Sequence, residues 1–110
     1  MNRKGTLVVT ATALVLGAGL LLAQQAPDGA ALYTRNCASC HGATGVPNAT
    51  MVRSLGPIPD FTAASMTSVA DSTLINTITG GKNKMPAYRT RLNPEQVRAV
   101  VGYVRTLVRR

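Results

Sequence analysis

Apolar residues recur along much of this 110-residue chain with the period of an α-helix. The clearest stretch is the last, where Asn93, Pro94 and Gln96 form a helix start signal. Apolar residues then follow at helical spacing, namely Val97, Val100, Val101, Val104, Leu107 and Val108. The pattern predicts a C-terminal helix that buries one face.

Two further helices are predicted upstream. Asp28 is a suitable N-cap for a short helix that runs into Cys37. A second helix begins near Asp71 or Ser72, carries apolar residues on one face and stops at Gly80-Gly81. Between them, residues 42–60 are rich in glycine and proline, and we expect an irregular loop with at most a short helical turn. No convincing buried strand run is evident, and helical periodicity dominates the exported part.

The N-terminus has the pattern of an export signal. Asn2-Arg3-Lys4 precedes an uncharged, mostly apolar stretch, and the apolar run 6–23 is 18 residues long. This is longer than the roughly 7 to 15 residues of a cleaved leader and at the threshold for a membrane-spanning helix. Residues 1–26 are therefore a signal peptide or an uncleaved membrane anchor. In both cases Arg3 and Lys4 stay on the cytoplasmic side and residues 27–110 form an exported domain, periplasmic or on the outer face of the membrane.

The candidate chemistry lies in Cys37-Ala38-Ser39-Cys40-His41. Two cysteines separated by two residues and followed by histidine are the pattern for covalent attachment of a c-type haem. Each thiol can add to one vinyl group of the same haem, and His41 can bind the iron as proximal ligand. The exported part has only four aromatic residues, so a bound haem would supply much of its core.

Three other interpretations of the cysteines were compared. A closed zinc site needs four ligands, whereas the chain has two Cys and one His in total. A thioredoxin-type pair needs a strand-helix-strand context, which the pattern lacks. A disulfide between Cys37 and Cys40, in a haem-free interaction module, leaves His41 unexplained.

The sixth iron position needs a second ligand or stays open. The exported methionines are Met51, Met66 and Met85. Met85 is favoured because it lies in a turn-rich segment with Pro86 behind it to restrict the backbone. Met51 follows His41 by only ten residues, and Met66 has the usual fate of methionine, packing in a core.

Basic residues exceed acidic ones in the exported part. From Gln24 onward, ten Lys or Arg stand against four Asp or Glu. The nearest approach to a cluster is Lys82, Lys84, Arg89 and Arg91, around Met85. These charges are either a solvated surface or a docking face that steers an acidic redox partner toward the haem. Export argues against nucleic acid as the partner.

Taken together, these motifs resemble the class I c-type cytochromes over nearly all of the exported domain. The shared features are Gly29 and Tyr33 ahead of Cys37, the Cys-x-x-Cys-His group, Met85-Pro86 with nearby Tyr88, and an Asn-Pro-Glu-Gln-Val helix. In that family the first and last helices cross closely, which would bring Gly29 and Tyr33 against Val100 and Tyr103. The family also holds the proximal imidazole with a proline carbonyl, for which Pro47, Pro57 and Pro59 are candidates.

The resemblance implies an all-α protein with a small cytochrome c fold, in which three to four helices wrap around one covalent haem c and an N-terminal hydrophobic helix precedes them. It implies Cys37 and Cys40 as attachment residues, His41 and Met85 as axial ligands, and one-electron transfer rather than enzymatic catalysis. The partners expected are acidic redox proteins or a membrane respiratory complex, with anchoring through residues 6–23 where the leader is kept. The alternative is a haem-bearing subunit of a larger dehydrogenase or oxidase.

Overall fold

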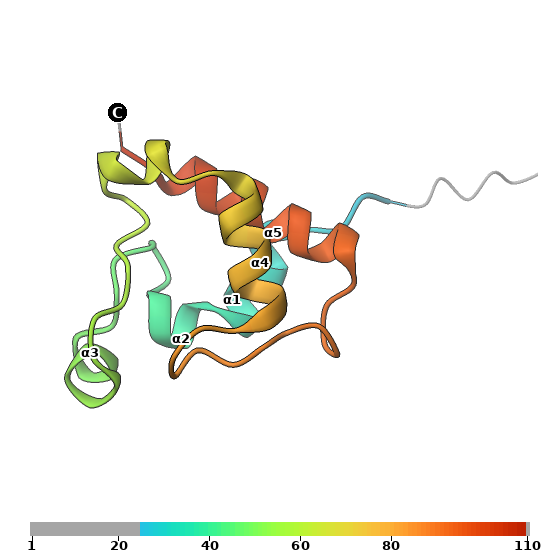
Figure 1. Ribbon diagram of the computed structural model, residues 1–110. Coiled ribbons are helices and arrows are strands. Elements are labelled where there is room, and N and C mark those ends of the chain that lie inside the picture. Colours follow the sequence, from blue (N-terminus) through green and yellow to red (C-terminus); the bar gives the residue numbers. More distant parts are fainter. Residues whose placement is uncertain (1–24, 110) are drawn as a thin grey trace, which may run out of the picture.

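The computed structural model describes residues 25–109, which form an all-α domain (Figure 1). Its elements are α1 (Gly29–Asn36), α2 (Ala38–His41), α3 (Ala49–Leu55), a 3₁₀-helix η1 (Ala64–Ser68), α4 (Asp71–Gly80) and α5 (Pro94–Leu107). Residues 25–109 contain no strand, only an isolated bridge between Lys82 and Met85. The predicted fold class is confirmed, with more short helices than the three to four expected.

The helix ends predicted from the sequence are formed by the predicted residues. In α5 the side chain of Asn93 accepts from the backbone N–H of Gln96 at 2.9 Å, and the Gln96 side chain accepts from the Asn93 N–H at 2.9 Å. Asp28 caps α1 through the N–H of Ala31. The reciprocal pair at α5 and the single bond at α1 satisfy backbone donors that a helix start leaves free, so both helices begin where the pattern indicates.

The expectation for residues 42–60 was wrong, because this stretch contains the two-turn helix α3. Asn48 accepts from the N–H groups of Thr50 and Met51, which makes it an N-cap. The helix ends at Gly56, whose φ is +93°. Asn48, which the sequence pattern assigned to a loop, thus starts a helix. Gly56, which the pattern indicated as a turn residue, ends it. Figure 1 shows α3 standing apart from the crossing of α1, α4 and α5.

The centre of the domain is the crossing of α1 and α5. A Cβ placed on Gly29 would lie 2.2 Å from the carbonyl oxygen of Ala99 and 3.2 Å from Cβ of Tyr103. The two backbones approach closely because Gly29 has no side chain. The predicted contact with α5 is therefore present, with Ala99 in place of Val100 as the nearest neighbour of the glycine.

The core joins α1, η1, α4 and α5. Its buried apolar residues are Leu32, Tyr33, Met66, Ile78, Leu92, Val97, Val100, Val101 and Val104. The first four apolar positions of the α5 stripe are buried, while Leu107 and Val108 pack at its edge. Met66 packs in this core, as expected.

The predicted N-terminal hydrophobic helix, and with it the signal or anchor over residues 1–26, falls almost wholly outside the described residues. Among the helices between residues 25 and 109, none has the length and apolar character needed to cross a membrane.

Candidate haem-binding site

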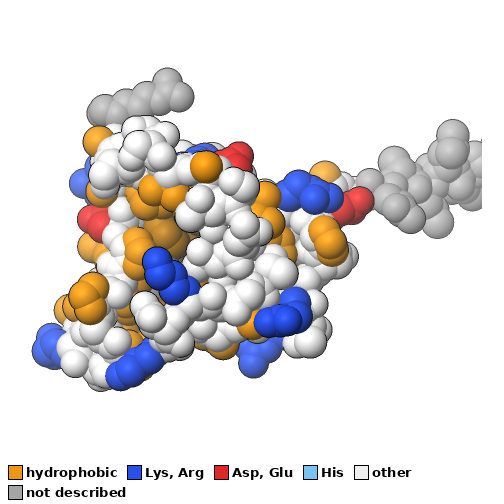
Figure 2. Space-filling model, viewed as in Figure 1, with side chains coloured by type: hydrophobic (Ala, Val, Ile, Leu, Met, Phe, Trp, Pro, Cys, Tyr) orange, Lys and Arg blue, Asp and Glu red, His pale blue; other side chains and the backbone are white. Residues whose placement is uncertain are grey.

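A large apolar cavity of about 770 Å³ lies between the helices, and the four residues expected to attach and ligate the haem, Cys37, Cys40, His41 and Met85, line it. Figure 2 shows a hollow on one face of the domain, with hydrophobic side chains in its walls and a basic side chain beside it. The lining comes from α1 and α2 (Tyr33, Asn36, Cys37, Ser39, Cys40, His41), the segment 55–61 (Leu55, Pro57, Ile58, Pro59, Phe61), η1 and α4 (Met66, Val69, Thr73, Leu74, Thr77, Ile78), the next loop (Lys82, Asn83, Lys84, Met85, Pro86, Tyr88) and α5 (Val100, Val101, Val104). A cavity of this size is within the range that holds cofactors.

The two cysteines reach this cavity because α1 ends just before them. Cys37 is the C-cap of α1, with its N–H bonded to the Tyr33 carbonyl at 2.8 Å, and its own carbonyl accepts from the N–H of His41 at 2.9 Å. One tight turn therefore carries Cys37, Cys40 and His41. Both thiols are free and half-buried. Burial, and secondarily Cys40, raises the pKa of Cys37 to about 11, so this thiol is protonated at neutral pH.

The imidazole of His41 is held mainly by an aromatic neighbour, with the backbone of Pro59 as a polar group beside it. Its ring stacks on Phe61 with centroids 4.5 Å apart and planes 11° apart. Its Nδ1 is buried and makes no hydrogen bond of ordinary geometry. Burial lowers the pKa of His41, and the backbone of Pro59 opposes this shift. The ring is therefore neutral at neutral pH, the form that binds metals.

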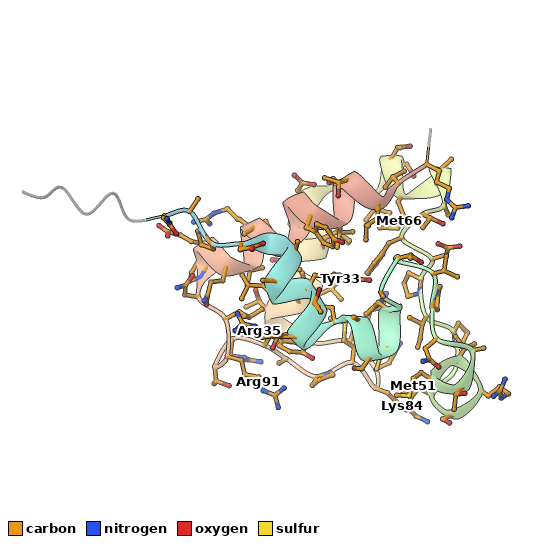
Figure 3. The ribbon with its side chains drawn as sticks, turned by 180° about the vertical axis from the view of Figure 1, so that it is seen from behind. Tyr33, Arg35, Met51, Met66, Lys84 and Arg91 are labelled. Atoms are coloured by element: carbon orange, nitrogen blue, oxygen red, sulfur yellow. The ribbon has the colours of Figure 1, made fainter. Side chains whose placement is uncertain are left out.

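Tyr33 supports the far side of the attachment segment. It is fully buried, and its hydroxyl donates to the Gly42 carbonyl at 2.6 Å, directly after His41. Burial is the main reason that the pKa of Tyr33 rises to about 12, so the hydroxyl remains a donor. Figure 3 shows Tyr33 directed from α1 into the domain.

Of the three candidate methionines, two line the cavity. Met85 and Met66 are lining residues, and Met51, on α3, is not among them. Met66 is 6% exposed and belongs to the core, whereas Met85 is half-buried in the loop after α4. Its backbone is fixed by reciprocal bonds with Lys82, of 2.9 and 3.1 Å. The preference for Met85 over Met51 thus agrees with where their side chains lie.

The residues present fit a covalent haem. Two free thiols and a neutral imidazole with an unpartnered nitrogen face an apolar cavity that also receives a thioether sulfur. Thiol, imidazole and thioether are the groups that attach and ligate haem in c-type cytochromes. The large hollow in so small a domain is explained when the haem is part of its core.

Sequence reasoning missed Phe61 and gave Tyr88 no role of its own. Phe61 is the only phenylalanine in the chain and follows Pro59-Asp60, which was the available signal. Tyr88 donates from its hydroxyl to the carbonyl of Asn36 at 2.9 Å. Burial raises the pKa of Tyr88, so its hydroxyl keeps its proton. Both contacts join segments far apart in the chain.

The four basic residues expected to cluster around Met85 lie at different sites in the structure. Lys82 and Lys84 are exposed at the cavity. Arg91 lies over the ring of Tyr88, 5.4 Å from its centroid. Arg89 instead lines a separate groove with Arg98 between α4 and α5. Figure 3 shows Arg35 and Arg91 on one side of the domain and Lys84 on another.

Comparison of the sequence with known proteins identifies relatives of this chain. Residues 24–104 match the family model for cytochrome C oxidase, cbb3-type, subunit III. Cytochrome c6 of Nostoc sp. is 37% identical over 76% of this chain and 71% of its own length. The cbb3-type cytochrome c oxidase subunit FixP of Azorhizobium caulinodans is 35% identical over 74% of this chain, which spans 27% of that protein.

A solved structure agrees with these sequence matches. The KustC0563 c-type cytochrome superimposes with a TM-score of 0.68 at 32% identity, over 74% of this chain and 99% of that one. These relatives are electron-carrying cytochromes or oxidase subunits, and the attachment motif of this chain has the pattern of one covalent haem c. The chain therefore belongs to the family of cytochrome C oxidase, cbb3-type, subunit III, and is a class I c-type cytochrome that carries one haem c and transfers electrons among redox partners.

Proposed function

We propose that Cys37 and Cys40 hold the haem covalently and that His41 and Met85 are the axial ligands of its iron. The observation that carries this proposal is that all four side chains line one apolar cavity of about 770 Å³. The protein is then a one-electron carrier between exported or membrane-bound partners. A haem held there would supply one-electron redox chemistry through its iron.

Attachment is an addition reaction that each thiol undergoes once. The sulfur of Cys37 or Cys40 would form a C–S bond to a vinyl carbon of the haem, and the thiol hydrogen would end on the neighbouring carbon. No atom leaves and no external oxidant is needed. The short turn of α2 holds the two thiols at a fixed separation, so both can react with one cofactor.

His41 is set up to bind iron through Nε2. Burial keeps the imidazole neutral, and stacking on Phe61 fixes its plane. The Pro59 backbone is the polar group beside this ring, so among the three candidate prolines it is the one we assign as acceptor for Nδ1–H. A hydrogen bond from the second ring nitrogen orients a ligating histidine and raises its basicity.

Met85 supplies the sixth ligand from the opposite segment. A thioether ligand raises the reduction potential of a haem relative to a second histidine. The apolar lining from α5 and α4 excludes water from the same space. With a haem bound, Met85 would hold the iron from the loop after α4 and the apolar side chains would keep water away from it.

The test compares Met85→Ala with Met66→Leu in the full chain expressed with haem-attachment machinery. Met85→Ala opens the sixth position, so we expect an altered visible spectrum and a lower reduction potential. Met66→Leu conserves volume in the core and keeps both properties near the parent protein. An unchanged spectrum and potential in Met85→Ala refutes this ligand. Intact mass measures covalent haem and leader cleavage in the same samples.

The partner we propose is an acidic redox protein that docks where Lys82 and Lys84 meet the cavity. Both side chains are exposed and border the space assigned to the haem. Attraction between opposite charges raises association rates and falls as salt screens it. Lys82→Gln with Lys84→Gln should therefore slow electron transfer to an acidic partner at low salt, while Arg98→Gln, on the separate groove, serves as control.

The second candidate is a haem-bearing subunit of a membrane oxidase, favoured by the likeness to the FixP subunit. It goes with retention of residues 6–23 as an anchor on the outer face of the membrane. Mass spectrometry distinguishes the two candidates. A chain cut near Ala23 or Ala26 fits a free periplasmic carrier, and an intact leader fits the oxidase subunit.

A further inference from the structure

Tyr88 connects the two segments that carry the proposed iron ligands. Its hydroxyl donates to the carbonyl of Asn36 at 2.9 Å across 52 residues of sequence. Asn36 is the last residue of α1 and directly precedes Cys37. Tyr88 itself follows Met85 by three residues. One side-chain bond therefore links the loop of Met85 to the attachment segment.

The backbone of Tyr88 is fixed by three further hydrogen bonds. Its N–H donates to the Ile78 carbonyl at 2.9 Å, and its carbonyl accepts from the N–H groups of Arg91 and Leu92 at 2.9 Å each. The guanidinium of Arg91 covers the ring. The residue is thus an ordered point at the end of the Met85 loop.

The loop before Tyr88 is held much less firmly. Of the hydrogen bonds recorded within residues 25–109, those made by residues 82–87 are the two between Lys82 and Met85, both internal to the loop. Lys82, Asn83, Lys84 and Pro86 are exposed. A segment with few bonds to its surroundings opens locally at low cost in free energy. Movement of Met85 away from the cavity is therefore limited by the hydrogen bonds that Tyr88 makes at the end of the loop.

We propose that Tyr88 is a positioning residue that latches the Met85 loop to the attachment segment and so limits displacement of Met85 from the iron by other ligands. This rests on the proposed assignment of Met85 as sixth ligand. In the closed state the hydroxyl is bonded to Asn36, and opening of the loop breaks that bond. The latch sets the equilibrium between a closed carrier and an iron open to small molecules.

The test is titration of the ferric full-chain protein with imidazole, a probe that competes with Met85 for the iron. Tyr88→Phe keeps the ring and removes the hydroxyl, so the open state becomes more populated. We expect imidazole to bind about fivefold more tightly, the factor that corresponds to about 1 kcal/mol for one hydrogen bond. A ligand that binds only the open state reports its population directly.

Tyr103→Phe is the matched control. Tyr103 is half-buried on α5, packs against Tyr33 at 5.1 Å and is not among the residues lining the cavity. Its imidazole affinity should equal that of the parent protein. Parent-like affinity in Tyr88→Phe, or equal tightening in both variants, overturns the latch.

Two more measurements separate the latch from a general structural role and from the ligand assignment. Tyr88→Phe that lowers the free energy of unfolding in guanidinium yet leaves imidazole affinity unchanged shows a merely structural hydroxyl, and overturns the proposal. In the Met85→Ala background, Tyr88→Phe should have no effect on imidazole affinity, and a fivefold effect there overturns it too. Failure of the Met85 assignment shows separately, as a parent-like spectrum of Met85→Ala alone.

Discussion

The two walls of the cavity are built in different ways. The wall of Cys37, Cys40 and His41 is tied to the rest of the domain on several sides: the Tyr33 hydroxyl holds Gly42, the Phe61 N–H donates to Gly45 at 2.9 Å, and the Phe61 ring stacks on His41. The wall of Met85 is a loop whose bonds to other elements begin only at Tyr88.

This difference suits the roles proposed for the two walls. A covalently attached cofactor with a proximal ligand needs a site whose geometry is set by many contacts at once. The methionine wall needs only enough restraint to keep the loop closed. We therefore expect substitutions in the first wall to lower global stability, and those in the second to change local opening.

The largest effect on stability is expected where α1, the helix that leads into Cys37, crosses α5. In Gly29→Ala the new Cβ would lie 2.2 Å from the Ala99 carbonyl oxygen, so the helices must separate. Overpacking of this kind costs about 1–3 kcal/mol in unfolding free energy, offset by at most about 1 kcal/mol of helix preference. Guanidinium unfolding followed by circular dichroism measures it. Gly102→Ala, with nothing within 4 Å of the new Cβ, is the control and should be stabilised; equal stability of the two variants would contradict the close crossing.

A smaller effect is expected at Phe61. Phe61→Leu removes the ring stacked 4.5 Å from His41 and should lower the free energy of unfolding by about 1 kcal/mol beyond the loss of apolar area. Phe61→Tyr keeps the ring and should retain most of that stability. Imidazole affinity in both variants should stay at the parent value, since the Met85 loop is untouched. Tighter imidazole binding in Phe61→Leu would show that the two walls are not independent.

The smallest effect is expected at the exposed carboxylate of Asp60, in the turn that carries Phe61. The hydroxyl and N–H of Thr62 donate to it at 2.7 and 2.8 Å and lower the pKa of Asp60. A lowered pKa in the folded state means stability that is present above the usual value of about 3.9 and is lost as pH falls through the folded value. Asp60→Asn should therefore unfold at lower guanidinium than the parent near pH 7, and this difference should shrink as the pH falls below the usual pKa of about 3.9. A stability difference that does not change with pH would assign the effect to the shape of the Asp60 side chain rather than to its charge.

Much of the helical framework was predictable because its signals are local. Asn93 and Gln96 cap α5, and the valines that follow are buried, as their spacing indicates. The helix α3 escaped prediction because asparagine and glycine, the residue types at its two ends, Asn48 and Gly56, are favoured in turns as well as at helix ends. The same residue types serve both purposes, and pattern alone does not separate them.

The candidate site was predictable in part for the same reason. Cys37, Cys40 and His41 lie so close together in the sequence that their motif can be recognised there. Met85 has Pro86 beside it as a local signal. Phe61 stands out in the sequence as the single phenylalanine, but its contact with His41 does not, because that contact depends on how the segment 42–60 returns to the cavity. Tyr88 was visible as an aromatic near Met85, but its bond to Asn36 was not.

The sequence by itself determined the cofactor class, the helical fold and the residues proposed to attach the haem, since each follows from neighbours within a few positions. Only the tertiary structure decided which proline lies beside His41, which basic residues border the cavity and how Tyr88 joins the two ligand-bearing segments. The physical reason is that these contacts join residues far apart in sequence, and periodicity along the chain says nothing about which distant side chains meet when the helices pack.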